Sequence, residues 1–318
     1  MMLGTRDVYG DTLVKLGERD TNIVVLDADL SASTRTCKFA CAFPDRFFNM
    51  GIAEQDMIST AAGLASCGKI PFVSTFAVFL TGRAWDQVRQ SVCYSDQNVK
   101  LVSTHSGITV GEDSATHHAN EDIALMRALP GMTVICPADG IETAQVIETV
   151  ARRKGPVYVR LARCKFPVIY DDAYRFELGR ASMLRDGTHA TIIAIGIMVS
   201  KALEAAEALE REGIPVRVLN MSTIKPIDTQ AIIDAARETG AIVTAEEHSV
   251  IGGLGSAVAE VVVESDRPCP MKRIGVRDCF GVSGKPDELL ERFCLGVRDI
   301  IEAARGVIQR KSRSQPPT

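Results

Sequence analysis

Several features that commonly indicate a partner or a compartment are missing from this 318-residue sequence. Aromatic residues make up 5% of the chain and the net charge is −4, so we expect no nucleic-acid or membrane partner. The longest apolar run, residues 190–199, is too short to span a bilayer. No basic stretch followed by an apolar one is found at the N-terminus, so no signal peptide is visible. These absences predict a soluble, cytoplasmic protein.

The cysteines indicate neither a disulfide framework nor a metal site. There are nine, an odd number, and no two form a CxxC pair. The closest two, Cys37 and Cys41, have no partner pair at the spacing of a zinc site. We therefore expect reduced thiols, as in a cytosolic protein, and no metal ligands from this chain.

Strand-like and helical patterns alternate along the chain. Apolar runs such as residues 70–74 and 99–103 are separated by segments of helical periodicity, which is typical of parallel sheets with helices on both faces. The alternation lapses between residues 162 and 176 and then resumes. We predict two α/β domains, each a mostly parallel sheet flanked by helices. The expected bounds are residues 1–170 and 178–310, followed by a disordered tail at 311–318.

Two glycine-rich stretches are similar to nucleotide-binding motifs, but each lacks a required residue. Residues 63–69 are similar to a phosphate-binding P-loop, yet Ile70 stands where Ser or Thr is needed for magnesium. Residues 252–256 follow a strand and open a helix, but Val258 occupies the third, small position of a dinucleotide fingerprint. A helix C-terminal glycine and a tight turn explain these stretches better.

Glu54 begins a helical segment that otherwise contains small and apolar residues. Most acids at such a position serve only to stabilise the positive end of the helix dipole. Gly51, shortly before it, allows close backbone approach, and the segment has almost no other polar residue. Glu54 could therefore instead exchange a proton with a bound heterocycle.

Two further pairs of residues have both a purely structural and a functional interpretation. Phe76 and Phe79 share a helix face, where they could pack in the core or stack on a flat heterocycle. Arg160 and Arg163 end the last strand of the first domain, where they could form a solvated edge or bind a sugar phosphate in forked geometry.

A polar segment, here called the histidine loop (residues 104–118), directly follows a predicted strand. It contains His105, His117 and His118, three of the five histidines. A hydrogen-bonded surface loop is one interpretation, and a metal site is disfavoured because adjacent histidines point apart and no cysteine assists. Together with Asp113, the histidines suit a polyhydroxylated substrate at the carboxyl end of a parallel sheet.

Taken together, these segments resemble the transketolase family of thiamine-diphosphate enzymes. The resemblance covers essentially the whole chain, as the pyrimidine-binding domain followed by the transketolase C-terminal domain. The motifs occur in the family's order and at similar intervals: Gly51-Ile52-Ala53-Glu54-Gln55, Thr75-Phe76 with Phe79, Thr104-His105-Ser106, Gly111-Glu112-Asp113 with Thr116-His117, and Leu161-Ala162-Arg163.

The resemblance implies which residues contact the cofactor. Glu54 would hydrogen-bond N1′ of the aminopyrimidine and favour the imino tautomer that deprotonates the thiazolium. Phe79, with Phe76 nearby, would stack on the pyrimidine ring. Asp29 matches the family's loop near the thiazolium.

The resemblance also implies the substrate residues. Ser33 matches the loop near the sugar phosphate, and His105 and Arg163 match phosphate binders. Asp113 and His117 match residues that contact sugar hydroxyls and handle protons. The implied catalytic residues are thus Glu54, His105 and His117.

The chain departs from the family pattern in two ways. Gly82 replaces the usual third aromatic, and Ser106 and Ala119 stand where many members have Asp and Pro, so the acceptor sugar is not implied. The Gly-Asp-Gly…Asn motif that binds the diphosphate through Mg²⁺ is also missing; residues 185–187 lack its first glycine. The chain therefore resembles the C-terminal half of a split transketolase, with magnesium ligands expected from an N-terminal subunit in an α2β2 enzyme.

The implied activity is transfer of a two-carbon ketol unit between sugar phosphates, as in pentose phosphate metabolism. The nearest alternatives are the β subunit of a 2-oxo acid dehydrogenase and half of a deoxyxylulose-phosphate synthase-like enzyme. A non-catalytic regulatory subunit is a further alternative, which Glu54 disfavours because a buried acid with no task costs stability. A nicotinamide oxidoreductase built on residues 252–256 ranks last.

Overall fold

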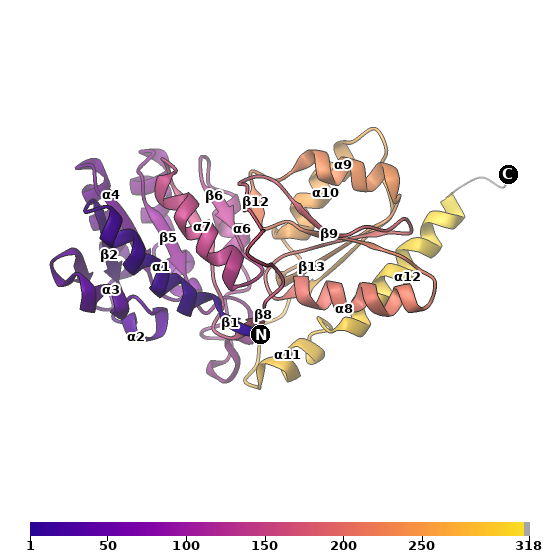
Figure 1. Ribbon diagram of the computed structural model, residues 1–318, viewed down its shortest axis with the longest axis horizontal. Coiled ribbons are helices and arrows are strands. Elements are labelled where there is room, and N and C mark those ends of the chain that lie inside the picture. Colours follow the sequence, from indigo (N-terminus) through magenta and orange to yellow (C-terminus); the bar gives the residue numbers. More distant parts are fainter. Residues whose placement is uncertain (315–318) are drawn as a thin grey trace.

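A seven-stranded sheet organises the first half of the chain (Figure 1). The structure is a computed structural model that describes residues 1–314. The strand order is β12-β6-β7-β5-β4-β2-β3, and only the pairing of β12 with β6 is antiparallel. The strands are β2 (Ile23–Asp27), β3 (Phe47–Asn49), β4 (Ile70–Ser74), β5 (Lys100–Ser103), β6 (Thr133–Ile135), β7 (Val157–Arg160) and β12 (Thr223–Lys225).

Helices cover both faces of this sheet because successive strand side chains point to opposite sides. Val25 and Phe72 pack in a cluster with α1 and α7, whereas Val24 and Val73 pack in another cluster with α4 and α6. The helices are α1 (Thr5–Arg19), α2 (Ser31–Thr34), α3 (Cys37–Ala42), α4 (Glu54–Ser66), α5 (Trp85–Gln87), α6 (Asp122–Arg127) and α7 (Gly140–Arg152). Shorter 3₁₀ turns are formed by Pro44–Arg46 and Ile108–Asp113, and π-helical turns by Phe79–Arg83 and Val88–Tyr94.

The second half of the chain forms a five-stranded sheet of order β14-β13-β10-β11-β9, in which β9 alone is antiparallel to its neighbour. Its strands are β9 (Ser182–Arg185), β10 (Thr191–Ala194), β11 (Arg217–Asn220), β13 (Ile242–Ser249) and β14 (Met271–Val276). Its helices are α8 (Met198–Arg211), α9 (Thr229–Glu238), α10 (Leu254–Glu264), α11 (Pro286–Arg292) and α12 (Val297–Ser314). The predicted α/β class, with mostly parallel sheets flanked by helices, is confirmed.

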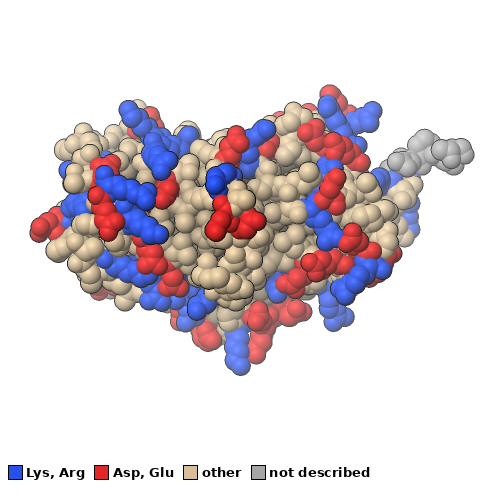
Figure 2. Space-filling model, viewed as in Figure 1, with Lys and Arg blue, Asp and Glu red and all other residues tan. Residues whose placement is uncertain are grey.

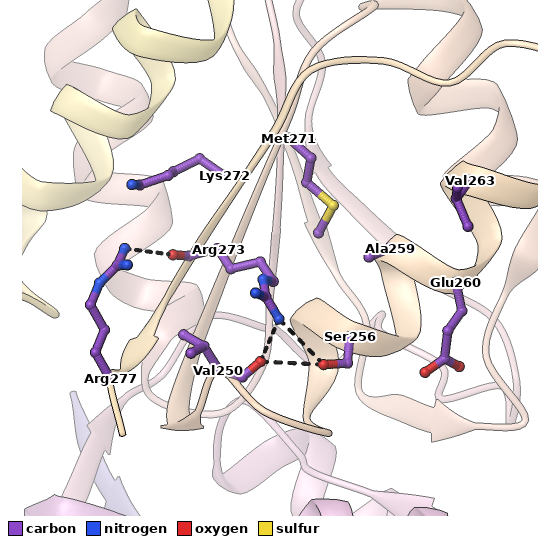
Figure 3. A pocket seen from close by; sticks show the side chains of 9 residues that line it. All are labelled: Val250, Ser256, Ala259, Glu260, Val263, Met271, Lys272, Arg273 and Arg277. Carbon is purple, nitrogen blue, oxygen red and sulfur yellow. Dashed lines mark hydrogen bonds between the residues drawn. The ribbon is translucent and has the colours of Figure 1, made fainter. Parts of the chain in front are cut away.

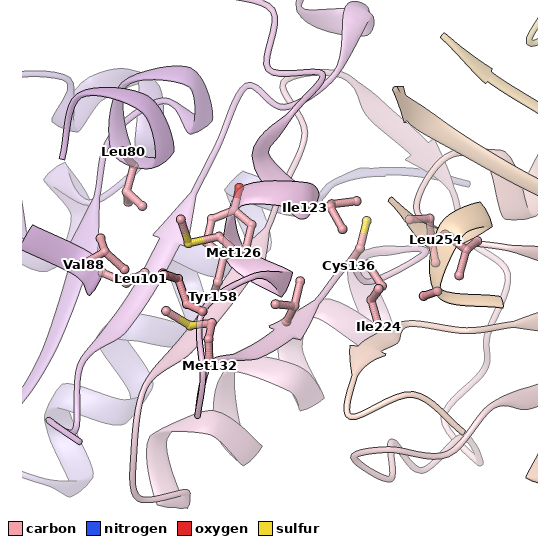
Figure 4. Packing of buried hydrophobic residues seen from close by; sticks show 14 of the residues in the cluster. Leu80, Val88, Leu101, Ile123, Met126, Met132, Cys136, Tyr158, Ile224 and Leu254 are labelled. Atoms are coloured by element: carbon pink, nitrogen blue, oxygen red, sulfur yellow. The ribbon is translucent and has the colours of Figure 1, made fainter. Parts of the chain in front are cut away.

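The two sheets share a hydrophobic core. Strand β12 belongs in sequence to the second half of the chain, yet it pairs with β6 of the first sheet. One buried cluster runs from Leu80 and Leu101 through Cys136 and Ile224 to Leu254 at the start of α10 (Figure 4). The halves are therefore fixed to each other by a shared strand and by continuous apolar packing.

The segment around residues 162–176 is ordered. Within it, β8 (Lys165–Pro167) pairs with β1 (Met2–Gly4), and the Tyr174 hydroxyl donates to Glu142 at 2.7 Å. At the C-terminus, α12 continues to Ser314, so the expected tail does not begin at residue 311. Residue 311 is held by a tertiary contact, in which Lys311 Nζ donates to the Thr239 carbonyl at 2.7 Å. The rest of the expected tail, residues 315–318, lies outside the described residues.

Acidic and basic side chains are interspersed on the face of the molecule drawn in Figure 2, consistent with the small net charge. Within residues 1–314, no helix combines the length and apolarity needed to cross a bilayer. All nine cysteines are free.

Candidate active site

The carboxyl ends of β2, β4 and β5 lie side by side because these strands are parallel neighbours. Each is followed within a few residues by a predicted site residue: Asp29 after β2, Phe76 after β4 and His105 after β5. The backbones stay adjacent beyond the strands, where Phe76 forms a bridge with Thr104. The sheet edge thus gathers three distant parts of the chain at the place where open parallel sheets commonly bind ligands.

Four rings form a cluster at this edge. Phe76 stacks on His105 with ring centroids 3.8 Å apart, and the planes of Phe76 and Phe79 are nearly parallel, with centroids 5.8 Å apart. His117 approaches Phe79 edge-on at 5.4 Å. Phe76 is buried, whereas Phe79 is only half-buried. The Phe79 ring therefore leaves apolar surface on which a flat ligand can stack.

Glu54 is the first residue of α4 and is 4% exposed. Its Oε1 accepts a hydrogen bond of 2.8 Å from Arg83 Nη1, and the Arg83 guanidinium lies 4.2 Å from the centre of the Phe79 ring. Arg83 thus links the buried carboxyl to the ring cluster. A cavity lined by residues 52–56 and Arg83 opens at the carboxyl, so a ligand from outside this chain can reach it.

His105 lies in a basic and buried environment. Its Nδ1 is 2.8 Å from Thr104 Oγ1 and its Nε2 is 3.5 Å from Arg6 Nη1. Burial, together with the charges of Arg6 and Arg163, lowers the pKa of His105 to about 3. The imidazole is therefore neutral near pH 7, which suits hydrogen bonding to an anion better than the proton transfer that the sequence suggested.

The histidine loop continues into the 3₁₀ turn Ile108–Asp113, which leaves Asp113 exposed. His117 returns to the ring cluster, with its Nδ1 2.9 Å from Thr116 Oγ1. His118 instead is buried, with its Nε2 3.1 Å from the Gly111 carbonyl. The adjacent histidines thus have different surroundings, and only His117 joins the predicted site.

Arg163 lies against the same loop. Its Nη1 donates to the Val110 carbonyl and to Glu112 Oε2, the latter at 3.1 Å. The side chain is about one-third exposed, at 36%. Its charge also contributes to the low pKa of His105, so the two predicted phosphate binders share one electropositive region.

Asp29 and Ser33 lie in the turn after β2. Asp29 has a φ of +62°, in the left-handed region, and its Oδ1 accepts from Asn49 Nδ2 at 3.0 Å. The Ser33 carbonyl accepts from Arg6 Nη1 at 2.9 Å. Since the same nitrogen approaches His105, Arg6 connects this turn with the histidine loop.

Arg160 does not belong to this site. Its Nε donates to Asp122 Oδ2 at 2.7 Å, and both side chains are almost fully buried between the two sheets. Neither of the two interpretations considered for Arg160, a solvated edge or a phosphate binder, is therefore right. The sequence could not reveal this buried ion pair, because nothing in the sequence around Asp122, the first residue of α6, indicates a contact with Arg160.

A cavity of about 660 Å³ lies elsewhere, between α10 and β14 of the second domain (Figure 3). Its lining includes the basic residues Lys272, Arg273 and Arg277, and Arg273 Nη1 donates to the Val250 carbonyl at 2.7 Å. None of the predicted site residues lines it. The ring cluster and this cavity are thus separate features.

The sequence did not indicate Arg6 or Arg83 as parts of the site. Arg6 lies in the first turn of α1 and looks like a solvated residue. Arg83 offered a weak signal, since it follows Phe79 by four residues and so shares its face in a helical turn.

Comparison with known proteins gives two family matches. The model described as "Transketolase, pyrimidine binding domain" matches residues 1–168, and "Transketolase, C-terminal domain" matches residues 179–300. A protein of Methanocaldococcus jannaschii described as "Putative transketolase C-terminal section" is 52% identical over 294 residues, which are 92% of each chain. The 6-deoxy-6-sulfo-D-fructose transketolase subunit SqwH of a Clostridium species is 46% identical, over 96% of this chain and 95% of its own.

A solved structure described as "Split gene transketolase, inactive beta4 tetramer" superposes with a TM-score of 0.91 at 52% identity. The match covers 97% of this chain and 99% of that one. The similarity therefore extends over nearly the full length of chains that carry only one section of the enzyme.

Proposed function

Because this chain belongs to the transketolase family, we propose that it forms the pyrimidine-binding half of a thiamine-diphosphate site whose other half is supplied by a separate subunit. It is a transketolase-type subunit, and the proposed reaction is transfer of a two-carbon ketol unit between sugar phosphates. The observation that carries this proposal is that Arg83 joins the buried Glu54 carboxyl, by a hydrogen bond, to the half-buried Phe79 ring, over which its guanidinium lies.

The described residues fit an aminopyrimidine ring. Glu54 offers a buried carboxyl, which can hydrogen-bond a ring nitrogen, and Phe79 offers a half-buried aromatic ring, over which the Arg83 guanidinium lies in this structure. The buried Thr75 Oγ1, next to Phe76, has no hydrogen-bond partner in the structure and could pair with a ligand. An aromatic ring, a carboxyl and an unpaired hydroxyl are groups that can contact such a heterocycle.

The diphosphate and its Mg²⁺ are proposed to lie on the partner. Within residues 1–314, no group of three or more His, Cys, Asp or Glu side chains is arranged to hold a metal ion. Ile52, beside the Glu54 cavity, is 77% exposed, which fits a surface that a second subunit covers. We propose an α2β2 assembly.

In the proposed mechanism, the bound cofactor supplies the electron sink for cleaving the ketose carbon–carbon bond. Glu54 holds and releases a proton at the pyrimidine nitrogen, while Phe76 and Phe79 orient the ring. His117, whose Nδ1 is engaged by Thr116, has its Nε2 available to a substrate hydroxyl.

The substrate's anionic end is proposed to lie between His105 and Arg163, in the electropositive region that also includes Arg6. Asp113 and Ser33, at the exposed edge of the site, are proposed to contact sugar hydroxyls and the phosphate, and Asp29 the cofactor. The name of the Clostridium relative specifies a sulfo sugar, which is also an anionic ketose. We propose sugar phosphates, including those of pentose phosphate metabolism, as substrates of a cytoplasmic enzyme; nine free thiols support this compartment.

Replacement of Arg163 tests the phosphate contact. In the assembled enzyme, Arg163→Met should raise the KM for xylulose 5-phosphate about 10- to 100-fold, because a charge-assisted hydrogen bond is lost. The kinetics of a non-phosphorylated ketose should change little. The exposed Arg152→Met, at 75% exposure, serves as the control. An equal loss with both kinds of sugar would show that Arg163 does not bind the phosphate.

A further inference from the structure

The second domain reaches into the histidine loop through Glu247 of β13. Glu247 is 3% exposed, and its Oε1 accepts from the Thr109 backbone amide at 2.5 Å. Gly107 packs directly against this carboxyl, with a φ of +73° and no room for a Cβ. The start of the loop is thus shaped to fit one side chain of the other domain.

The end of the loop is tied to the same residue through Arg160. Arg160 Nη2 donates to the Glu247 carbonyl at 2.8 Å and to the Ala119 carbonyl at 3.2 Å. The Ala119 carbonyl also accepts from the Gly107 amide at 2.9 Å. Both ends of the loop therefore meet at Glu247.

The middle of the loop has its own contact with the second domain, since Ser283 Oγ donates to the Glu112 carbonyl at 2.9 Å. Between these contacts, the Val110 carbonyl and the Glu112 carboxyl hold the Arg163 guanidinium. The path from Glu247 to Arg163 is short: Thr109, which Glu247 binds, is bonded directly to Val110.

We infer that Glu247 is a positioning residue, through which the C-terminal domain holds the histidine loop in the shape that presents Asp113, His117 and Arg163 to the substrate. This inference rests on the proposed function for the identity of the substrate, but the loop contact itself stands on geometry. It gives the C-terminal domain a part in substrate binding.

The chemistry of Glu247 indicates which replacement preserves the contact. Burial raises the pKa of Glu247 to about 7, opposed by the charge of Arg160 and reinforced by Asp122. A backbone amide can donate to either a protonated or an ionised carboxyl. Gln therefore keeps the acceptor for Thr109, whereas Ala removes it and leaves the amide buried without a partner.

The test combines hydrogen–deuterium exchange with kinetics. In the purified chain, Glu247→Ala should increase the amide exchange rate of residues 107–113 about ten-fold, because one hydrogen bond is lost. Glu247→Gln should leave that rate the same as in the unmodified chain. Glu246→Ala is the matched control: the neighbouring carboxyl is equally buried but accepts from the amides of Leu254 and Gly255, so it should leave loop exchange unchanged. Unchanged loop exchange in Glu247→Ala would overturn the inference.

In the assembled enzyme, Glu247→Ala should raise the KM for the phosphosugar about ten-fold, because one hydrogen bond is lost. The change in kcat should be smaller. The Glu247→Gln enzyme should have the KM of the unmodified enzyme. A loosened loop with an unchanged KM would also overturn the positioning role. If the unmodified assembly transfers no ketol unit, the proposed function fails, whereas the exchange experiment still decides whether Glu247 holds the loop.

Discussion

Glu54→Gln should lower kcat for ketol transfer on the order of 10³-fold in the assembled enzyme, which is the usual range for losing a group that transfers a proton. The amide has nearly the shape of the carboxyl and can still accept from Arg83 Nη1, so the start of α4 should remain intact. It cannot hold and release a proton at the pyrimidine nitrogen. Steady-state kinetics at saturating cofactor, with circular dichroism of each variant, measures the effect.

The control for this experiment lies in the same helical turn. Asp56 is exposed and shares the favourable end of the helix dipole with Glu54, so Asp56→Asn tests the dipole effect alone. We expect its activity to stay within about two-fold of the unmodified enzyme, because an exposed helix-dipole charge contributes only a few tenths of a kcal/mol. Equal losses of activity from both replacements would show that Glu54 only stabilises the helix.

Asp122→Ala should destabilise the chain by roughly 3–5 kcal/mol, since it leaves the buried Arg160 charge without its carboxylate partner. Asp122 also accepts from the Tyr158 hydroxyl at 2.6 Å, so a second buried group loses its partner. Because Arg160 contacts Ala119 and Glu247 as well, the damage should extend to the domain boundary. Urea unfolding followed by circular dichroism gives the free energy of unfolding.

A surface ion pair provides the comparison. Arg19 and Glu148 are 3.2 Å apart with exposed fractions of 59% and 35%, so Glu148→Ala should cost less than about 1 kcal/mol. If Asp122→Ala cost no more than this, the buried pair would not be a main support between the domains.

The fold class could be predicted from the sequence, whereas the joining of the domains could not. The alternation of apolar runs and helical segments is local, and it correctly indicated parallel sheets flanked by helices. Strand β12 has the same local pattern whichever sheet it joins. Its pairing with β6 depends on contacts between residues about ninety positions apart, such as Thr223 with Ile135, which no periodicity reveals.

The sequence could predict only those residues of the candidate site that come shortly after a strand. Phe76 and His105 come directly after β4 and β5, so the rule that ligands bind at strand carboxyl ends brought them together. Arg6 and Glu247 reach the site by tertiary folding alone, whereas Arg83 was indicated only weakly, by its spacing from Phe79 in one helical turn. The protonation behaviour of His105 was also beyond the sequence, because it depends on burial and on two arginines distant along the chain.

The most direct test of the central claim is a two-carbon transfer assay with xylulose 5-phosphate, thiamine diphosphate and magnesium. It would be run with this chain alone and with the chain after co-purification with its diphosphate-binding partner from its source cell. We expect ketol transfer only from the co-purified assembly. Transfer by the isolated chain would contradict the split site, and an assembly that instead oxidises a 2-oxo acid would contradict the transketolase reaction.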